Sequence, residues 1–263
     1  MKSESKWAIV TGGSGGIGWE LSRLLANDGY NLVLVAQDST KLKKSAVILK
    51  NDFGISAIDI ALDLCQPSSA GEIFQRIEQE NIKIDVLINN AGFGAFGNFW
   101  QISLERQLDM IQINDYSLTK LTGLVLPSMI KRGSGRILNV ASTAAFQPGP
   151  LMAVYYASKA YVLSFSEALS NELKGTGISV SALCPGPTPT MFQERAGNSK
   201  SKLLNNWMIT DASMVAKAGY QGMLKGKQVI IPGILNKIMA LSVRFSPRKS
   251  VTAVTRWIQE TRR

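Results

Sequence analysis

The octapeptide TGGSGGIG, residues 11–18, most constrains the fold, because it lies between a short apolar run and a segment of helical pattern. The residues before it, WAIV, are typical of a buried strand. Glycines at such a point let the backbone turn sharply and approach a pyrophosphate, and the helix that follows presents free N–H groups. The turn contains the spacing G-x-x-x-G-x-G at Gly12, Gly16 and Gly18, and also a G-x-G-x-x-G that starts at Gly13. It predicts nucleotide binding, with a plain tight loop as the alternative.

Beyond this turn, short β-rich runs alternate with segments of helical length. The strand patterns lie at residues 7–13, 31–36, 56–64, 84–92, 135–142 and 178–186, and KQVIIPG at 227–233 suggests a seventh. Strands separated by helices, such as those expected at 118–132 and 158–174, imply right-handed βαβ crossovers. The expected fold is therefore α/β of the Rossmann type: a doubly wound parallel β-sheet of about seven strands, with helices on both faces.

The length and composition suit one domain rather than two. The chain has 263 residues, of which 45% are hydrophobic, enough for a substantial core. We expect residues 1–263 to form a single domain, with 233–263 as a helical C-terminal extension. Within that extension we predict helices at roughly 234–245 and 248–261, separated by a Ser-Pro pair.

The chain has no histidine, which excludes any Ser-His-Asp or Cys-His nucleophile and any histidine-bound metal. We find no cluster of metal-ligating residues in the sequence either and expect no metal, so acid–base chemistry falls to tyrosine, lysine or a carboxylate. Cys65 and Cys184 come near the ends of expected strands and are typical of inert core thiols in a reducing compartment. We therefore expect a cytoplasmic protein, and the polar start MKSESK predicts no secretion signal.

The net charge is +10, and much of the excess lies toward the C-terminus. The basic residues there are Lys237, Arg244, Arg248, Lys249, Arg256, Arg262 and Arg263. Because no nucleic-acid-binding motif accompanies them, we expect no nucleic acid partner and instead a general attraction for anionic cofactors, acyl carriers or lipid surfaces. No uncharged apolar run reaches about 18 residues, so no transmembrane helix is predicted.

Four motifs, in the family's order, resemble the short-chain dehydrogenase/reductase family. They are TGGSGGIG at 11–18, NNAG at 89–92, Y-x-x-x-K at Tyr155 and Lys159, and PGPTPT at 185–190, and the resemblance spans roughly residues 5–192. It implies one dinucleotide-binding and catalytic domain. It also implies an NAD(P)-dependent oxidoreductase that transfers hydride between a nicotinamide and a ketone or secondary alcohol.

The pentapeptide YYASK puts two tyrosines within reach of Lys159 on a helix. Ser142 precedes Tyr155 by thirteen residues, the separation seen in relatives, so Tyr155 is the expected acid/base and Tyr156 a packing neighbour. Because an ammonium stabilises a phenolate, we expect Lys159 to lower the pKa of Tyr155, while Ser142 hydrogen-bonds the substrate oxygen. By resemblance, Lys159 also binds the nicotinamide ribose, and Asn114 holds a water that links Lys159 to solvent.

The resemblance also assigns the residues that would bind the cofactor. They are Gly12, Gly16, Ile17 and Gly18 at the pyrophosphate, Gln37, Asp63, Asn90, Ala91 and Gly92 on the adenosine side, Pro185, Gly186, Thr188 and Thr190 beside the carboxamide, and Tyr155 with Lys159. Some have plain structural alternatives: NNAG also stabilises the sheet, and Pro185 with Gly186 also makes a rigid turn.

The end of the second strand, in NLVLVAQDST, distinguishes NAD from NADP in most Rossmann enzymes. Relatives that prefer NAD usually have an aspartate where Ala36 stands, and those that prefer NADP often have arginine in place of Gln37. Neither is present here, and Asp38 can simply cap the next helix. We expect NADP rather than NAD, because no carboxylate at position 36 repels a phosphate and positive potential comes from Lys41, Lys43 and Lys44.

Apolar residues dominate the three segments that form the variable walls of such a site. They are Phe93, Phe96, Phe99, Trp100, Phe146, Met152, Met191, Phe192, Trp207 and Met208. Each taken alone fits a core or subunit contact, but together they favour a hydrophobic substrate such as an acyl chain, a steroid-like ketone or an aromatic ketone.

The basic tail is longer than in relatives that end soon after the last strand. It resembles a bacterial subgroup and some hydroxysteroid and long-chain 3-oxoacyl reductases. We interpret it as a helical pair packed on the domain, with peripheral membrane contact as the alternative. The family also implies a homodimer, built from the fourth and fifth long helices, or a homotetramer.

Two other functions compete with the oxidoreductase. One is a cofactor-binding regulatory protein without turnover, and the other is a membrane-surface protein whose tail is the functional element. The complete set Asn114, Ser142, Tyr155 and Lys159 argues against the first, because a protein that only binds a cofactor has no need of all four.

Overall fold

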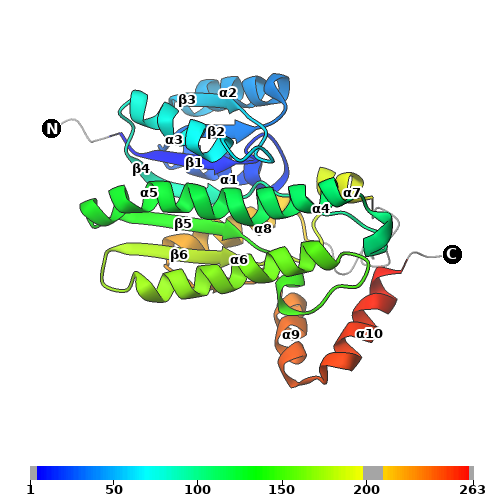
Figure 1. Cartoon of the computed structure of the whole chain (residues 1–263). Helices are drawn as coiled ribbons and strands as arrows, with labels where there is room; N and C mark the ends of the chain where they lie inside the picture. Colours follow the sequence, from blue (N-terminus) through cyan, green and yellow to red (C-terminus); the bar gives the residue numbers. More distant parts are fainter. Residues whose placement is uncertain (1–4, 198–209, 261–263) are drawn as a thin grey trace.

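The computed structural model describes residues 5–197 and 210–260, which form a parallel seven-stranded sheet between two layers of helices (Figure 1). The strands are β1 (Trp7–Thr11), β2 (Asn31–Ala36), β3 (Ala57–Ala61), β4 (Ile84–Asn89), β5 (Gly135–Val140), β6 (Ile178–Leu183) and β7 (Val229–Ile230). Their order across the sheet is β3-β2-β1-β4-β5-β6-β7, and every pairing is parallel. The predicted doubly wound sheet is confirmed, although the seventh strand is only two residues long.

Helices cover both faces of the sheet. They are α1 (Gly16–Asn27), α2 (Ser39–Phe53), α3 (Ser69–Gln79), α4 (Leu104–Ile111), α5 (Leu118–Arg132), α6 (Ala153–Glu172), α7 (Met191–Ala196), α8 (Ala212–Leu224), α9 (Ile234–Ser242) and α10 (Arg248–Gln259). One core cluster joins α1, α2 and α8 to the sheet, and side chains of α3, α5 and α6 pack on the other face. The described part also contains short 3₁₀ turns at Phe99–Gln101, Thr143–Phe146 and Val243–Phe245.

The strands are apolar on both sides because both sides are covered. In β1, Ala8 and Val10 pack under α1, whereas Ile9 packs with side chains of the opposite layer, and all three are fully buried. This continuous apolar pattern is typical of parallel sheets, whose crossover helices shield both faces.

The chain changes direction between β1 and β4, which are neighbours in the sheet although two strands lie between them in sequence. The crossovers on either side of this point lead away from each other. They leave a crevice at the carboxyl ends of the central strands, the usual ligand site of such sheets.

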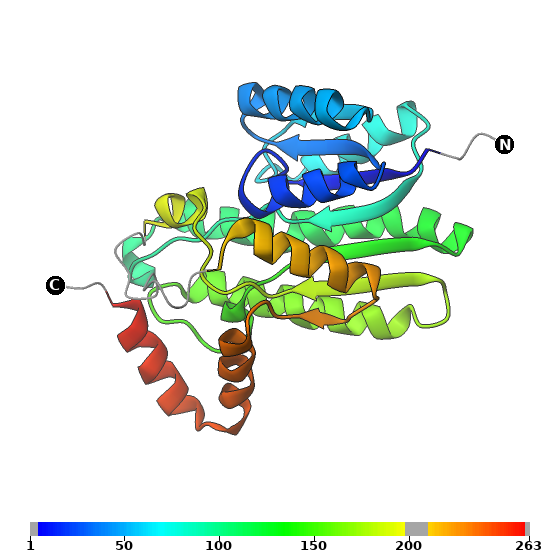
Figure 2. The same ribbon diagram turned by 180° about the vertical axis from the view of Figure 1, so that it is seen from behind.

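The C-terminal extension forms two helices, as predicted. Helix α9 runs into the 3₁₀ turn Val243–Phe245, and α10 follows after Pro247. Figures 1 and 2 show the pair as a V that projects beyond the carboxyl edge of the sheet, with its tip at the connection between the two helices.

Candidate active site

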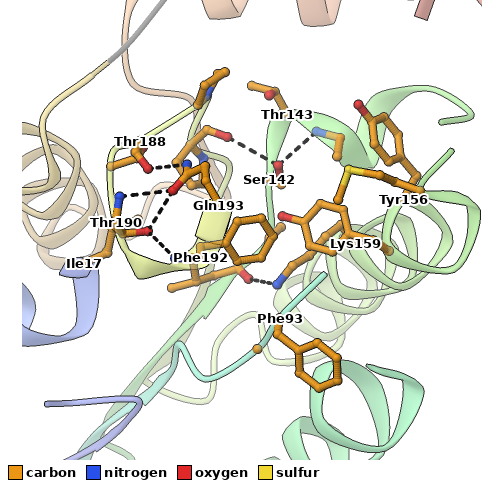
Figure 3. A pocket seen from close by; sticks show the side chains of 18 of the residues that line it. Ile17, Phe93, Ser142, Thr143, Tyr156, Lys159, Thr188, Thr190, Phe192 and Gln193 are labelled. Carbon is orange, nitrogen blue, oxygen red and sulfur yellow. Dashed lines mark hydrogen bonds between the residues drawn. The ribbon is translucent and has the colours of Figure 1, made fainter. Parts of the chain in front are cut away.

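A cavity of about 960 Å³ lies at the carboxyl ends of the central strands. It extends from the turn between β1 and α1, past Ser142 and Tyr155, to α9 and α10. Figure 3 shows its middle part, with Thr188 and Thr190 on one side and Tyr156 and Lys159 on the other. The volume lies at the upper end of the range of roughly 300–1,000 Å³ that is usual for ligand pockets, so the cavity has room for more than one small molecule.

The glycine turn keeps its backbone accessible at Gly12 and Gly16, which have no side chain. Gly12 (φ 67°) and Gly16 (φ 54°) have left-handed backbones that other residues rarely adopt. A Cβ on Gly12 would lie 2.7 Å from Asn90 Nδ2, which donates a hydrogen bond to the Thr11 carbonyl at 2.9 Å. Helix α1 begins at Gly16, so the free N–H groups of its first turn lie at the cavity. The turn therefore fits an anionic pyrophosphate.

Gly18 has a different role from the predicted cofactor contact. It is buried and is not among the residues that line the cavity, whereas Gly12, Gly16 and Ile17 are. A Cβ on Gly18 would lie 2.3 Å from the Gly12 carbonyl oxygen and 2.4 Å from Asn90 Nδ2. We therefore no longer assign Gly18 as a cofactor contact. Because Gly18 has no side chain, α1 can pack against the back of the turn.

Gln37 and Asp63 lie together past the ends of β2 and β3. Gln37 Nε2 donates to Asp63 Oδ2 at 3.1 Å, and Asp63 Oδ1 accepts from the Cys65 N–H at 3.0 Å. Asp38 caps α2 by accepting the Lys41 N–H at 2.9 Å, the role that the sequence allowed for it. Gln37, Asp38 and Asp63 all line the cavity, at the end of the second strand where adenosine ribose contacts are expected.

One of the three nearby lysines reaches the cavity. Lys41 lines it, whereas Lys43 and Lys44 do not. A Cβ on Gly15 would lie 3.0 Å from Lys41 Nζ, so this ammonium lies over the glycine turn. The sequence predicted positive potential here, and the fold identifies the side chain that supplies it at the site.

Ser142 and Tyr155 meet in the middle of the cavity. Ser142 follows β5, and its Oγ accepts from the Ala144 N–H at 3.1 Å and donates to the Pro185 carbonyl at 3.5 Å (Figure 3). Tyr155 is buried on α6, and its phenol lies near enough to Ser142 for that hydroxyl to lower the pKa of Tyr155. Two hydroxyl groups that converge in this way can both hydrogen-bond one substrate oxygen.

Lys159 lies one helical turn beyond Tyr155 and is buried as well. Its Nζ donates to the Val140 carbonyl at 2.8 Å and lies 5.9 Å from the centre of the Tyr155 ring. Burial lowers the pKa of Lys159 to about 8, because an ammonium loses hydration there. The cavity therefore contains a cation that titrates near neutral pH.

The expectation that Lys159 lowers the pKa of Tyr155 is wrong for this structure. Burial raises the pKa of Tyr155, the hydrogen bond with Ser142 lowers it, and Tyr156 raises it again, while Lys159 is not among the groups that shift it. The physical reason is that burial deprives the phenolate of hydration, whereas the ammonium donates its hydrogen bond to the Val140 carbonyl. Tyr155 is thus held as a neutral acid, the form that can donate a proton to a ketone oxygen.

Asn114 lies in a π-helical turn, Gln112–Ser117, rather than in a regular helix. Asn114 is buried, and its side chain makes two hydrogen bonds to the backbone of Phe93. Nδ2 donates to the carbonyl at 3.1 Å, and Oδ1 accepts from the N–H at 3.2 Å. Nδ2 also donates to Ser158 Oγ at 2.9 Å. Asn114 therefore ties the segment after β4 to α6 beside Lys159, and the water relay assigned to it stays a prediction.

The segment after β6 folds over the glycine turn, and Pro185, Gly186, Thr188 and Thr190 all line the cavity as predicted. A Cβ on Gly16 would lie 3.0 Å from Thr190 Cγ2, so the two segments are in close contact. Gln193, which no sequence motif indicates, holds the loop by accepting the Thr190 N–H at 3.1 Å (Figure 3). Asn90, Ala91 and Gly92, after β4, line the cavity as well.

Only some of the predicted apolar residues form the wall beyond Tyr155. Those that line the cavity are Phe93, Met152, Met191 and Phe192. Phe99 and Trp100 point into solvent, with 57% and 80% of their surfaces exposed, and Phe96 and Phe146 are not part of the lining. Trp207 and Met208 lie outside the described residues.

The far wall of the cavity comes from α9 and α10, which the sequence analysis interpreted as a pair packed on the domain. Their lining residues are Met239, Ala240, Ser242, Val243, Ser246, Ser250, Val251, Val254, Thr255, Ile258 and Gln259. Gln259 Nε2 donates to Tyr156 Oη at 2.5 Å, so Tyr156 joins α10 to the helix that carries Tyr155. This face of α10 could have been predicted from the sequence by the helical spacing of four residues: Val251, Val254, Thr255 and Ile258.

Residues 6–201 match the family model for short chain dehydrogenases. The chain belongs to the short-chain dehydrogenase/reductase family. The assembled glycine turn, Ser142, Tyr155 and Lys159 thus lie in the part of the chain that the family model covers.

Individual relatives of this short-chain dehydrogenase/reductase span different shares of it. The very-long-chain 3-oxoacyl-CoA reductase of Rattus norvegicus is 37% identical over 188 residues, 68% of this chain and 58% of the relative. The 17-beta-hydroxysteroid dehydrogenase type 3 of Mus musculus is 34% identical over 250 residues, 90% of this chain and 78% of the relative. A solved short-chain dehydrogenase from Sphingobium yanoikuyae in complex with NADPH is 31% identical, with a TM-score of 0.82 over 91% of this chain and 93% of that one. The chain thus spans less than two thirds of the length of the first of these relatives.

The residue after Asn114 adds a titratable group to the site of this short-chain dehydrogenase/reductase. Asp115 is partly buried, and its Oδ1 has no hydrogen-bond partner among the described residues. Burial raises the pKa of Asp115 to about 7 and Lys159 lowers it, while Asp115 in turn raises the pKa of Lys159. The two groups therefore titrate near neutrality as a coupled pair. Sequence reasoning missed Asp115 because only the fold shows that it is buried near Lys159.

Other features of the described residues add no further chemistry. Cys65 and Cys184 are free thiols, and burial raises the pKa of each to about 12. Within residues 5–197 and 210–260, no three His, Cys, Asp or Glu residues are grouped to hold a metal. No helix in those ranges combines the length and apolar composition needed to cross a bilayer.

Proposed function

We propose that this short-chain dehydrogenase/reductase is an NAD(P)-dependent oxidoreductase that transfers hydride between a nicotinamide and a hydrophobic ketone or secondary alcohol. The observation that carries the proposal is one continuous cavity in which Ser142 and Tyr155 lie between a glycine turn and an apolar wall. We also treat residues 1–263 as one domain, because α9 and α10 line the same cavity as the glycine turn.

The cofactor end of the cavity fits a dinucleotide. Gly12, Gly16 and Ile17 would hold the pyrophosphate at the start of α1, where backbone N–H groups are free. Gln37, Asp63, Asn90, Ala91 and Gly92 would border the adenosine, and Pro185, Gly186, Thr188 and Thr190 the carboxamide. When bound, the nicotinamide supplies hydride to the substrate carbon in one direction and accepts it in the other.

The chain's own residues would complete the reaction by moving one proton. In reduction, Tyr155 donates its hydroxyl proton to the carbonyl oxygen, so the ketone gains a hydride and a proton and becomes an alcohol. Ser142 donates a hydrogen bond to the same oxygen and keeps it in place. Lys159, a buried cation beside Tyr155, would bind the nicotinamide ribose, and Asn114 holds the adjoining backbone.

The far wall supports a bulky, apolar substrate. Phe93, Met152 and Phe192 stand beside Tyr155, and the apolar side chains of α9 and α10 continue the surface away from it. Relatives named for very-long-chain 3-oxoacyl-CoA and 17-beta-hydroxysteroid substrates favour the same class. We propose an acyl chain or a steroid-like or aromatic ketone rather than a small charged sugar.

A substrate panel tests the function directly. Long-chain 3-oxoacyl thioesters, steroid ketones, aromatic ketones and a ketose would each be incubated with NADPH and with NADH, and nicotinamide absorbance would be followed. We expect turnover with at least one bulky apolar ketone and none with the ketose. Tight cofactor binding without turnover on any ketone would instead support a regulatory protein.

Lys41 supports a preference for NADP over NAD, because its ammonium lies over the glycine turn that follows β1. We expect Lys41→Ala to raise KM for NADPH by about tenfold, the effect of losing one charge-assisted contact of about 1.5 kcal/mol. KM for NADH should change little, since NADH has no 2′-phosphate. Lys44→Ala, on the same helix but outside the cavity, is the control. Equal changes in KM for both cofactors would count against the preference.

Asp115 gives a prediction about pH. At pH above about 7 its carboxylate is charged and raises the pKa of Lys159. In Asp115→Asn that charge is absent, so Lys159 loses its proton at a lower pH, and the alkaline limb of kcat/KM should move to lower pH. Activity well below pH 7 should stay within about twofold, because Lys159 is protonated there in both proteins. Rates measured from pH 5 to 10 would check this, and an unmoved limb would contradict it.

Assembly and location stay predictions. A homodimer through α4, α5 and α6, or a homotetramer, is supported by exposed apolar side chains on α4, on α6 and on the turn between α4 and α5: Leu104, Leu108, Ile111, Tyr116 and Tyr161. A cytoplasmic location is supported by the free thiols of Cys65 and Cys184.

A further inference from the structure

The outward face of α9 is apolar, which is the reverse of an ordinary surface helix. Ile234, Ile238 and Leu241 follow one another along it at helical spacing, and 75%, 58% and 55% of their surfaces are exposed. Phe245, in the turn that follows, is 83% exposed. The side of α9 that packs on the protein carries Asn236, which is buried. The described part of the chain therefore leaves a row of large apolar side chains uncovered.

Basic side chains accompany this apolar row. Residues 233–260 contain five lysines and arginines and a single acidic residue, Glu260, which is itself ion-paired. Arg244 and Arg248 are exposed on either side of Phe245, at the tip of the V (Figures 1 and 2). The tip thus combines an exposed aromatic ring with positive charge, and it projects away from the sheet.

Charge decides which partner this surface fits. A second copy of the chain would bring the same positive residues face to face, and like charges oppose such contact. An anionic lipid surface offers negative charge for Arg244 and Arg248, together with an apolar interior for Phe245 and Ile238. Trp257, exposed on α10, belongs to the residue type that favours the boundary between headgroups and acyl chains.

We infer that the C-terminal helix pair, α9 to α10, docks on an anionic lipid bilayer through the tip around Phe245 and the apolar row of α9. Binding is peripheral and reversible, with the apolar side chains in the headgroup region and the basic ones at the phosphates. The inference goes beyond the proposed function and does not depend on it. Met239 of α9, Val243 of the turn and Val254 of α10 also line the cavity. Docking would therefore bring an apolar cavity close to the apolar compounds that a bilayer holds.

The test is co-sedimentation of the full chain with vesicles of phosphatidylcholine alone and of phosphatidylcholine with phosphatidylserine. We expect binding to the second kind, weakened by high salt. Ile238→Glu/Phe245→Glu should reduce the bound-to-free ratio by at least about tenfold, because two charges enter the apolar contact. Arg244→Gln/Arg248→Gln should weaken binding chiefly at low salt. Val47→Glu/Met214→Glu is the matched control, since both residues are exposed to a similar degree elsewhere, on α2 and α8.

Thermal unfolding and NADPH binding would establish that each variant is folded, and neither readout requires turnover. If Ile238→Glu/Phe245→Glu fails to fold, the Arg244→Gln/Arg248→Gln variant alone tests whether the helix pair docks on the bilayer. Wild-type protein that stays in the supernatant with the phosphatidylserine vesicles would overturn the inference, as would variants that sediment like wild type. A wild-type dimer that becomes a monomer only in Ile238→Glu/Phe245→Glu would assign this face to a second copy instead.

Discussion

Tyr155→Phe is expected to lower kcat by about 10²–10⁴-fold, the usual contribution of a positioned general acid. The substitution removes only the phenol hydroxyl, and the ring stays packed against Phe192, 5.2 Å away between ring centres. The cofactor end of the cavity is unchanged, so the Kd for NADPH should stay within about twofold. Turnover and fluorescence titration of NADPH on the same preparation would measure both.

Tyr156→Phe is the matched control, because the neighbouring tyrosine is also buried on α6. Its hydroxyl accepts from Gln259 of α10 and not from Ser142, so its loss should change kcat only a few-fold. The free energy of unfolding should fall by about 1 kcal/mol, the net worth of one hydrogen bond. Small and equal effects of the two substitutions on kcat would refute the assignment of Tyr155 as the acid.

Lys159→Met is expected to lower kcat/KM by about 10²–10³-fold and to weaken cofactor binding, since it removes the buried cation that would hold the nicotinamide ribose in place beside Tyr155. Methionine fills much of the same space, so the packing of α6 is largely kept. Wild-type activity should fall as pH rises through about 8, where Lys159 loses its proton. That alkaline limb should be absent in Lys159→Met.

Lys159→Met should also change how the free energy of unfolding depends on pH, in a direction that the pKa of Lys159 determines. The folded-state pKa of Lys159, about 8, is below its ordinary value of 10.5. Between these values the unfolded chain binds more protons than the folded one, so the free energy of unfolding rises with pH. In Lys159→Met this part of the rise should disappear, as urea titrations between pH 7 and 11 would show. An unchanged pH dependence of both activity and stability would contradict the placement of Lys159 as a buried cation.

Much of the fold was predictable because its signals are local. The apolar run at 31–36 forms β2 at those residues, and LTKLTGLVLPSMIKR forms α5 over Leu118–Arg132. A strand buried on both faces needs an unbroken apolar run, and a glycine turn needs backbone conformations that few other residues adopt, so both appear directly in the order of residues. The cavity contacts of Gly12, Ser142 and Tyr155 follow from the same motifs.

The order of residues by itself thus determined the sheet, the turn at its switch point and the group of hydroxyl and amine side chains beside it. Three features became visible only in the folded chain: Gly18 packs behind the turn, Lys41 rather than Lys43 or Lys44 reaches the site, and α10 closes the cavity through Gln259. The fold also reversed the expected pKa shift of Tyr155. The reason is physical: backbone conformation and alternation of apolar residues are set by neighbours in sequence. Desolvation and side-chain contact depend on which distant segments the fold brings together.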